Sequence, residues 1–310
     1  MWLLALSLLN EKDYTCWVVA PSLMPRKAGD RVKTQRRDAM PLARLARSGA
    51  LAVVAVPQVD EEAMRDLTRA RADTLSALQA PQCRRKAFLL RHDRRYTGRA
   101  TGGPAPLRWL SEVVWPTPAP PSGFQAYVRA VPEPTARRQR LAQERHEHGQ
   151  AWRLAPVVEA LQALRGVHCT VAGPLGAAMG ARPRLDSPRA RMKGLGLMPS
   201  EDASGDQRRQ GPLPKAGTPQ ARRVLVAGAW AYRSPAPVRR HWPLRLATPP
   251  KGSPALRGQA QGSLCQRSRR LGSRGQHAHV GTGARARELT GFLWAMAQAG
   301  PIIASDAVGA

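Results

Sequence analysis

Two short apolar runs near the beginning of the chain predict buried β-strands. Residues 16–20 read CWVVA, residues 51–56 read LAVVAV, and a proline follows each run. Apolar runs of this length that end at proline are typical of strands. Between them Leu42 and Leu45 stand at helical spacing, so the segment predicts strand, helix and strand, the order of a parallel βαβ unit. Two strands make only part of a sheet, so an incomplete α/β domain is expected here.

The pattern becomes helical after this unit. Over residues 60–95 apolar side chains recur at helical spacing, and Pro81 is expected to break or kink the helix. Residues 98–123 carry Gly and Pro in clusters (TGGPAP and PTPAPPSG), which is typical of a linker. A helical region interrupted by a linker is therefore predicted.

Further helices are predicted in the second half of the chain. Residues 135–153 favour a polar helix, and Pro156 suits the first turn of a short apolar helix. The segment GPLG at residues 173–176 is interpreted as a turn. Residues 288–299 predict a terminal helix, whereas residues 249–283 hold too few apolar positions to bury much surface, so poor order is expected there.

No membrane span or secretory leader is predicted. The opening apolar run, residues 2–9, is far shorter than the roughly 20 residues that cross a bilayer. It has no basic segment before it and no small-residue cleavage site after it. The four cysteines stand far apart without Cys-x-x-Cys spacing, which indicates neither a zinc site nor a disulfide framework. A cytoplasmic protein without a membrane partner is expected.

The charge balance predicts a polyanionic partner. Lys and Arg number 49 against 21 Asp and Glu, which gives a formal charge of +28, and only seven of these cations are Lys. Such an excess attracts nucleic acid. Arginine can also hold a phosphate or a guanine edge with two parallel donors. Abundant Arg together with Ala, Gly and Pro is also what coding bias would produce, and this alternative stays open.

Two segments carry candidate chemistry. The first reads KTQRRDA at residues 33–39 and places Asp38 three residues after Gln35. The second reads LGLMPSEDASGDQRRQG at residues 195–211, and basic residues follow it. Within the second segment Ser204 is followed by glycine, and this dipeptide taken alone indicates only a turn.

Both segments belong to an ordered series that resembles one family. The series continues with EEAMRDLTRAR, KAFLLRHDRRYTGRA, LRWLSEVVWP, PVVEALQALRGV, LDSPRA, ARRVLVAGAWAY and ARELTGFLWA, and it covers most of residues 16–296. In this series the chain resembles the bacterial insertion-sequence transposases of the IS-one-ten family. The resemblance implies a DNA transposase that cleaves phosphodiesters and transfers strands.

The resemblance also implies a fold that is α/β and then α. A partial RuvC-like unit of RNase H type is expected at residues 1–58, a helical linker at residues 59–155 and a mostly helical C-terminal transposase domain at residues 156–248. Residues 249–310 are expected to form a basic tail, with disordered segments rich in Gly, Pro and Arg, and a terminal helix. The implied partners are DNA, a structured RNA encoded by the element, and further copies of the chain.

The catalytic residues of the family carry over unevenly. Ser204 matches the nucleophilic serine, and Asp38 matches the second acid of an Asp-x-x-Asp motif whose first position is Gln35 here. In the family a DEDD set of carboxylates holds Mg²⁺, and its first two acids are expected upstream of the region that begins at Cys16. A neutral amide balances no cation charge. Weak Mg²⁺ binding at Asp38 and impaired activity are therefore predicted.

Basic residues beside the two segments are predicted to contact nucleic acid, because arginine binds phosphate with paired donors. These residues are Arg36, Arg37, Arg208, Arg209, Lys215, Arg222 and Arg223. Transposition is the predicted function. Two alternatives stay open: a non-catalytic nucleic-acid-binding remnant of a transposase, and an unfolded relic without function.

Overall fold

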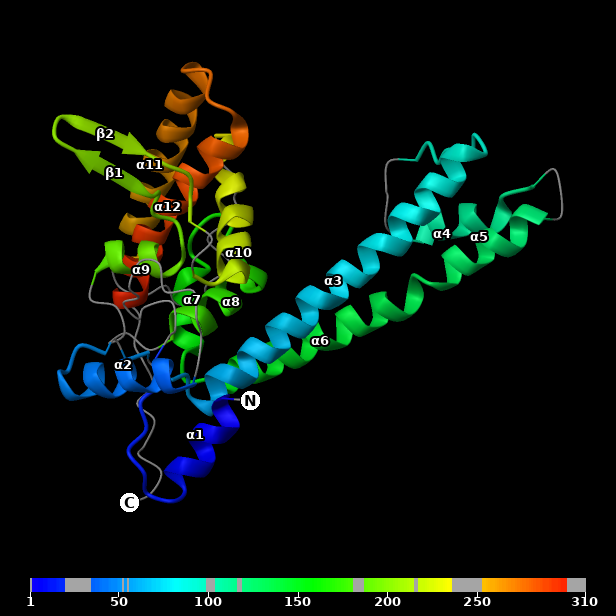
Figure 1. Cartoon of the computed structure of the whole chain (residues 1–310). Helices are drawn as coiled ribbons and strands as arrows, with labels where there is room; N and C mark the ends of the chain where they lie inside the picture. Colours follow the sequence, from blue (N-terminus) through cyan, green and yellow to red (C-terminus); the bar gives the residue numbers. More distant parts are fainter. Residues whose placement is uncertain are drawn as a thin grey trace. The chain divides into compact units, whose positions relative to one another are not determined.

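The chain forms two units, Met1–Gln58 and Val59–Ala310. The described residues are mostly helical and contain a single two-stranded sheet in the second unit (Figure 1). A computed structural model describes residues 2–19, 35–51, 53–54, 56–98, 104–115, 119–180, 187–214, 217–235 and 253–299.

Two helices are described in the first unit, α1 (Trp2–Asn10) and α2 (Gln35–Arg47). The α2 helix confirms the helix predicted between the two apolar runs. It has an acid, Asp38, in its first turn and two bases, Arg44 and Arg47, in its last turn. These are the ends at which the helix dipole stabilises each sign of charge.

The two apolar runs of the first unit meet, but they do so antiparallel. Val19 and Val53 form an isolated antiparallel bridge, and the backbone N–H of Val54 donates to the carbonyl of Val18 at 2.7 Å. The predicted parallel pairing is therefore wrong for the described residues. The runs are short and share a single bridge, which is too little ladder to fix the register of a sheet. The RuvC-like architecture of this unit stays a prediction.

Two long helices, α3 (Val59–Arg91) and α6 (Pro132–Ala151), lie side by side and form an antiparallel arm (Figure 1). Of the break or kink predicted at Pro81, the break is wrong, because α3 continues through this residue, and the kink stays a prediction. A proline inside a helix removes one backbone hydrogen bond and costs about 3 kcal/mol. Packing of α3 against α6 along the arm offsets this cost. The predicted polar helix over residues 135–153 is confirmed as α6.

The segment predicted as a linker, residues 98–123, instead includes one helix and the start of another: α4 (Pro104–Glu112) and α5 (Ala119–Arg129). Four of the prolines that suggested a linker, Pro104, Pro106, Pro120 and Pro121, stand in the first turn of α4 or α5, where proline disrupts no helical hydrogen bond. The two helices close a small apolar cluster at the end of the arm, formed by Leu89, Leu110 and Phe124.

The remaining helices gather around one apolar core. Its elements are α7 (Ala155–Leu161), α8 (Cys169–Met179), α9 (Pro188–Gly194), α10 (Pro219–Ala229), the 3₁₀ helix η3 (Trp230–Arg233), α11 (Ser253–Ser273) and α12 (Ala278–Ala299). The predicted short apolar helix is confirmed as α7, and the predicted terminal helix as the second half of α12.

Two further predictions are wrong in this region. The turn predicted at residues 173–176 is part of α8, and a Cβ added at Gly176 would lie 2.9 Å from Val158 Cγ2. Glycine there permits close packing of α8 on α7 and does not signal a turn. Residues 253–273, expected to lack order, form α11. A narrow buried stripe that includes Ala260 and Leu264 packs one face of this helix against the core.

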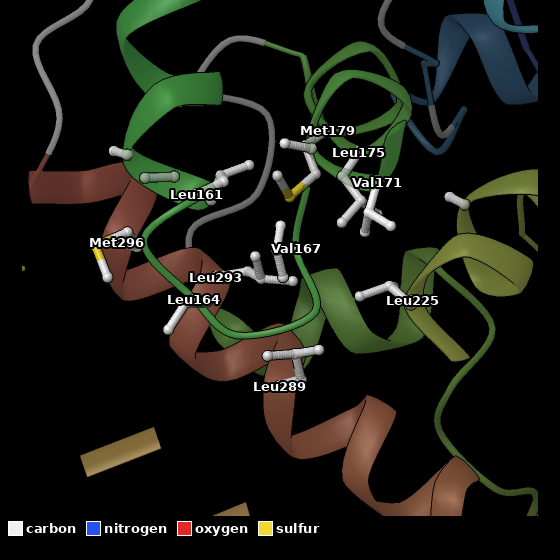
Figure 2. Packing of buried hydrophobic residues seen from close by; sticks show 14 of the residues in the cluster. Leu161, Leu164, Val167, Val171, Leu175, Met179, Leu225, Leu289, Leu293 and Met296 are labelled. Atoms are coloured by element: carbon white, nitrogen blue, oxygen red, sulfur yellow. The ribbon is translucent and has the colours of Figure 1, made fainter. Parts of the chain in front are cut away.

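The core is continuous across α7, α8, α10 and α12 (Figure 2). In α12 the side chains of Ala286, Leu289, Leu293 and Met296 are at most 1% exposed, and their spacing places them on one face. Burying a large apolar side chain completely stabilises a fold by about 1.5–3 kcal/mol. None of the described helices has both the length and the apolar character needed to cross a bilayer.

Candidate nucleic-acid interface

The segment with the predicted nucleophile folds as an exposed β-hairpin. Strands β1 (Glu201–Ser204) and β2 (Gln207–Gln210) pair antiparallel, with Ser204 opposite Gln207. Gly205 has a φ of 58° as the first of two turn residues, which is the conformation that a type II′ hairpin turn requires. All residues of both strands are exposed. The hairpin therefore presents Ser204 to solvent at its turn.

The predicted residues divide between the two faces of the hairpin. Side chains alternate along a strand, so Ser204, Asp202 and Arg209 share one face, and Glu201 and Arg208 share the other. Arg208 Nη2 donates to Glu201 Oε2 at 3.1 Å, and both side chains are exposed. An exposed ion pair of this kind contributes little to stability, so Arg208 stays available to a stronger anion.

The Arg208 face of the hairpin borders a basic pocket of about 240 Å³. Three arginines and a single acidic residue line this pocket, because α9 contributes Arg189 and α12 contributes Arg287. In the described part of the chain neither of these two arginines forms an ion pair. A pocket with this charge can hold a phosphate group. Its remaining lining comes from Met198, Pro199, Glu201 and Gln210.

The local fold of α9 positions Arg189. The hydroxyl of Ser187 caps the helix by accepting from the backbone N–H of Ala190 at 3.2 Å, as serine commonly does at a helix start. Two residues beyond Arg189, Arg191 is 2% exposed in the core, and burial lowers the pKa of its guanidinium. The buried arginine fixes the rotation of α9, so Arg189 lies on the exposed side at the pocket.

The basic residues directly after the hairpin were also predicted to contact nucleic acid, and those that the structure describes, Arg222 and Arg223, do not line this pocket. Arg222 of α10 donates from Nη1 to the carbonyl of Pro214 at 3.1 Å and approaches the carbonyl of Gly196 at 3.4 Å. It therefore braces the two ends of the hairpin segment. Arg223 on the same helix is exposed, and Lys215 lies outside the described residues.

A second basic surface runs along α11. Arg267, Arg270 and Arg274, together with Gln266 and Leu271, line a depression of about 320 Å³. One of these arginines, Arg267, forms an ion pair with Glu288, with 3.2 Å between Arg267 Nη1 and Glu288 Oε2.

The predicted metal ligand stands in the first unit, on α2. Asp38 and Arg36 are exposed there, and the side chain of Arg37 lies outside the described part. In the ranges that the structure describes, no group of three or more His, Cys, Asp or Glu side chains is placed to hold a metal ion. Asp38 supplies one carboxylate, and Gln35 one turn earlier is a neutral amide, so weak Mg²⁺ binding at this position stays a prediction.

Arg189 and Arg287 were not predicted from the sequence. They are distant along the chain from the hairpin and from each other, so no local motif joins them. A signal was nevertheless present: Arg189 lies in LDSPRA and Arg287 in ARELTGFLWA, two of the segments that carry the family resemblance.

Comparison with known proteins agrees with this resemblance. The model of the transposase family IS116/IS110/IS902 matches residues 158–241. A protein of Sinorhizobium fredii assigned as transposase y4qE is 40% identical over 291 residues, which is 94% of this chain and 71% of that protein. The transposase for insertion sequence element IS1533 of Leptospira borgpetersenii is 37% identical over 86 residues, covering 27% of this chain and 25% of that protein.

Proposed function

The chain belongs to the IS116/IS110/IS902 family of transposases. We propose that it binds the DNA of an insertion sequence, cleaves a phosphodiester with Ser204 as the nucleophile and transfers the DNA strand. The observation that carries this proposal is the exposed hairpin, which holds Ser204 beside its turn and borders the basic pocket. A structured RNA of the element and a second copy of the chain are further proposed partners, and these rest on the family resemblance alone.

DNA binding is supported by the charge of the pocket. Arg189, Arg208 and Arg287 converge on a space that can take a backbone phosphate, and arginine holds phosphate oxygens with paired donors. The whole chain carries a formal charge of +28, which draws any duplex toward this surface. Contacts of this kind position a protein on DNA without reading its sequence.

Ser204 would act as a nucleophile toward phosphorus. Its Oγ forms a bond to the phosphorus, the bond from phosphorus to the leaving sugar oxygen breaks, and the hydroxyl proton passes through solvent to that oxygen. Arg209 stands on the same face, diagonal to Ser204 across the strands, within reach of a phosphate bound there. Its guanidinium would stabilise the charge on the phosphate oxygens as the bond forms.

The activation of Ser204 is weak in this chain. Serine needs a base or a metal to take its proton, and no described side chain accepts a hydrogen bond from its hydroxyl. The described residues around Asp38 do not fit Mg²⁺, so no step is assigned to the metal. Slow transfer is the consequence that we expect.

A non-catalytic DNA-binding role is the second candidate function. It is favoured by Gln35, which stands where the family's metal motif has an acid. Under this alternative the basic pocket still binds DNA, and Ser204 is only the last residue of a strand.

A covalent-adduct assay separates the two functions. The full chain is incubated with labelled DNA from the element's ends, and the products are resolved under denaturing conditions. The transfer function predicts a faint protein-linked band that disappears in Ser204→Ala and persists in Ser200→Ala, a variant that loses a hydroxyl at the other end of the same hairpin. A band of equal strength in both variants, or none in the unmodified chain, would overturn the assignment of Ser204.

A further inference from the structure

Three arginines gather where the arm meets α8. Arg71 comes from α3, and Arg138 and Arg145 come from the same face of α6, two turns apart. Burial lowers the pKa of the Arg71 guanidinium, and the positive charges of Arg145 and Arg138 lower it further. The three groups are therefore close enough to repel one another. We refer to Arg71, Arg138 and Arg145 as the arginine triad.

Several donors of the triad are buried without a partner in the described part of the chain. Arg145 is 5% exposed, and no described residue accepts a hydrogen bond from its Nε or Nη1. Its remaining nitrogen, Nη2, lies 3.8 Å from Cys169 Sγ, which is a weak acceptor. The Nε atoms of Arg71 and Arg138 are likewise buried, and no described residue accepts a hydrogen bond from them. In the described part of the chain no carboxylate forms an ion pair with any triad arginine.

This arrangement is costly without a counter-anion. Buried charged groups are normally paired, because removing a charge from water without a partner costs several kcal/mol. Three like charges that share one site add mutual repulsion to that cost. An anion between the three arginines would accept hydrogen bonds from the free donors and would also offset the repulsion between the positive charges.

The start of α8 adds a further positive element. The helix begins at Cys169, which Arg145 contacts, and its N-cap residue His168 supplies no side-chain cap. The first amide groups of a helix favour an anion, and the helix dipole acts in the same direction. The unpartnered donors of Arg145 and the helix start therefore point to the same kind of ligand.

We propose that the arginine triad and the first turn of α8 form a second phosphate site, which holds one phosphate of a nucleic-acid backbone. A phosphate offers several oxygens to guanidinium groups that approach from different elements, which a single carboxylate does less well. Arg71 and Arg138 are only half-buried, so part of each side chain is accessible to a strand. The site lies on elements other than the hairpin and its pocket, so it extends the proposed DNA contact to the arm.

The first test measures thermal melting of the full chain in inorganic phosphate and in chloride at equal ionic strength. Phosphate is expected to raise the melting temperature of the unmodified chain and of Arg140→Gln, which removes an exposed charge from the same helix. Arg145→Met is expected to lose this rise and to melt higher in chloride, because it removes an unpaired buried charge. If Arg145→Met does not fold, the half-buried Arg138→Gln serves instead. Equal phosphate effects in all folded variants would overturn the site.

The second test distinguishes a nucleic acid from free phosphate. Affinity for duplex DNA and for a structured RNA is measured over a salt series with the same variants. Loss of one phosphate contact reduces the slope of log affinity against log salt by about one. We expect this reduction in Arg145→Met for at least one of the two nucleic acids, and not in Arg140→Gln. If Arg145→Met left the salt slope unchanged for both nucleic acids, while phosphate still raised the melting temperature of the unmodified chain, the site would bind only a small anion and the nucleic-acid contact would be overturned. Neither test uses Ser204, so failure of the transfer function leaves this inference standing.

Discussion

Replacing Gly166 with alanine should destabilise the second unit through a close backbone contact. Gly166 lies in the connection between α7 and α8 with a φ of 77°. A Cβ at this position would lie 2.3 Å from the carbonyl oxygen of Gly228 in α10 and 2.8 Å from Cβ of Ala231. An L-residue in the left-handed region costs about 1–2 kcal/mol. Overpacking against backbone that cannot move aside adds about 1–3 kcal/mol.

The expected total loss is about 2–5 kcal/mol in the free energy of unfolding. Urea denaturation followed by far-ultraviolet circular dichroism measures it directly. The matched control is Gly205→Ala, because Gly205 has a φ of 58° and an added Cβ would meet no atom of the described residues within 4 Å. The control should show only the conformational cost. If Gly166→Ala lost no more stability than Gly205→Ala, the close approach of the α7–α8 connection to α10 would be refuted.

Two further perturbations test the packing. Burial raises the pKa of Tyr232, so its hydroxyl stabilises the fold fully below about pH 10, the ordinary pKa of tyrosine, and this contribution is lost as the pH rises further. Tyr232→Phe should therefore flatten the fall in melting temperature that the unmodified chain shows at alkaline pH. The same alkaline profile in both proteins would contradict the burial of Tyr232. Arg153→Met should lower the free energy of unfolding by about 3–5 kcal/mol, because Arg153 forms an ion pair with the fully buried Glu61. A loss below about 1 kcal/mol in urea denaturation would show that this pair is exposed to solvent.

Periodicity predicted the helices whose apolar residues form a clear stripe. The short helix that begins near Pro156 and the terminal helix with Leu289 and Leu293 are both confirmed, because each buries one face against the core. The breaks and turns predicted from proline and glycine were wrong where tertiary packing stabilises a continuous helix. Pro81 lies inside a helix that the arm supports, and Gly176 marks a close helix contact.

The candidate site could be predicted only in part. The sequence identified the family and singled out Ser204 with its neighbouring arginines, because these stand together along the chain. It could not show that Arg208 and Arg209 lie on opposite faces of a hairpin, since that depends on strand register. Arg287 of α12 and Arg208 of the hairpin line the same pocket, and no local pattern along the chain brings these two residues together.

The salt dependence of duplex-DNA binding tests the proposed interface most directly. Fluorescence anisotropy of the full chain, of Arg287→Gln and of Arg140→Gln over a salt series gives the slope for each. We predict a steep fall of log affinity with log salt, because many phosphate contacts release counterions. Arg287→Gln should reduce the slope by about one, and Arg140→Gln, exposed on the arm, should not. A flat titration of the unmodified chain, or the same slope in all three proteins, would contradict DNA binding through the pocket beside the Ser204 hairpin.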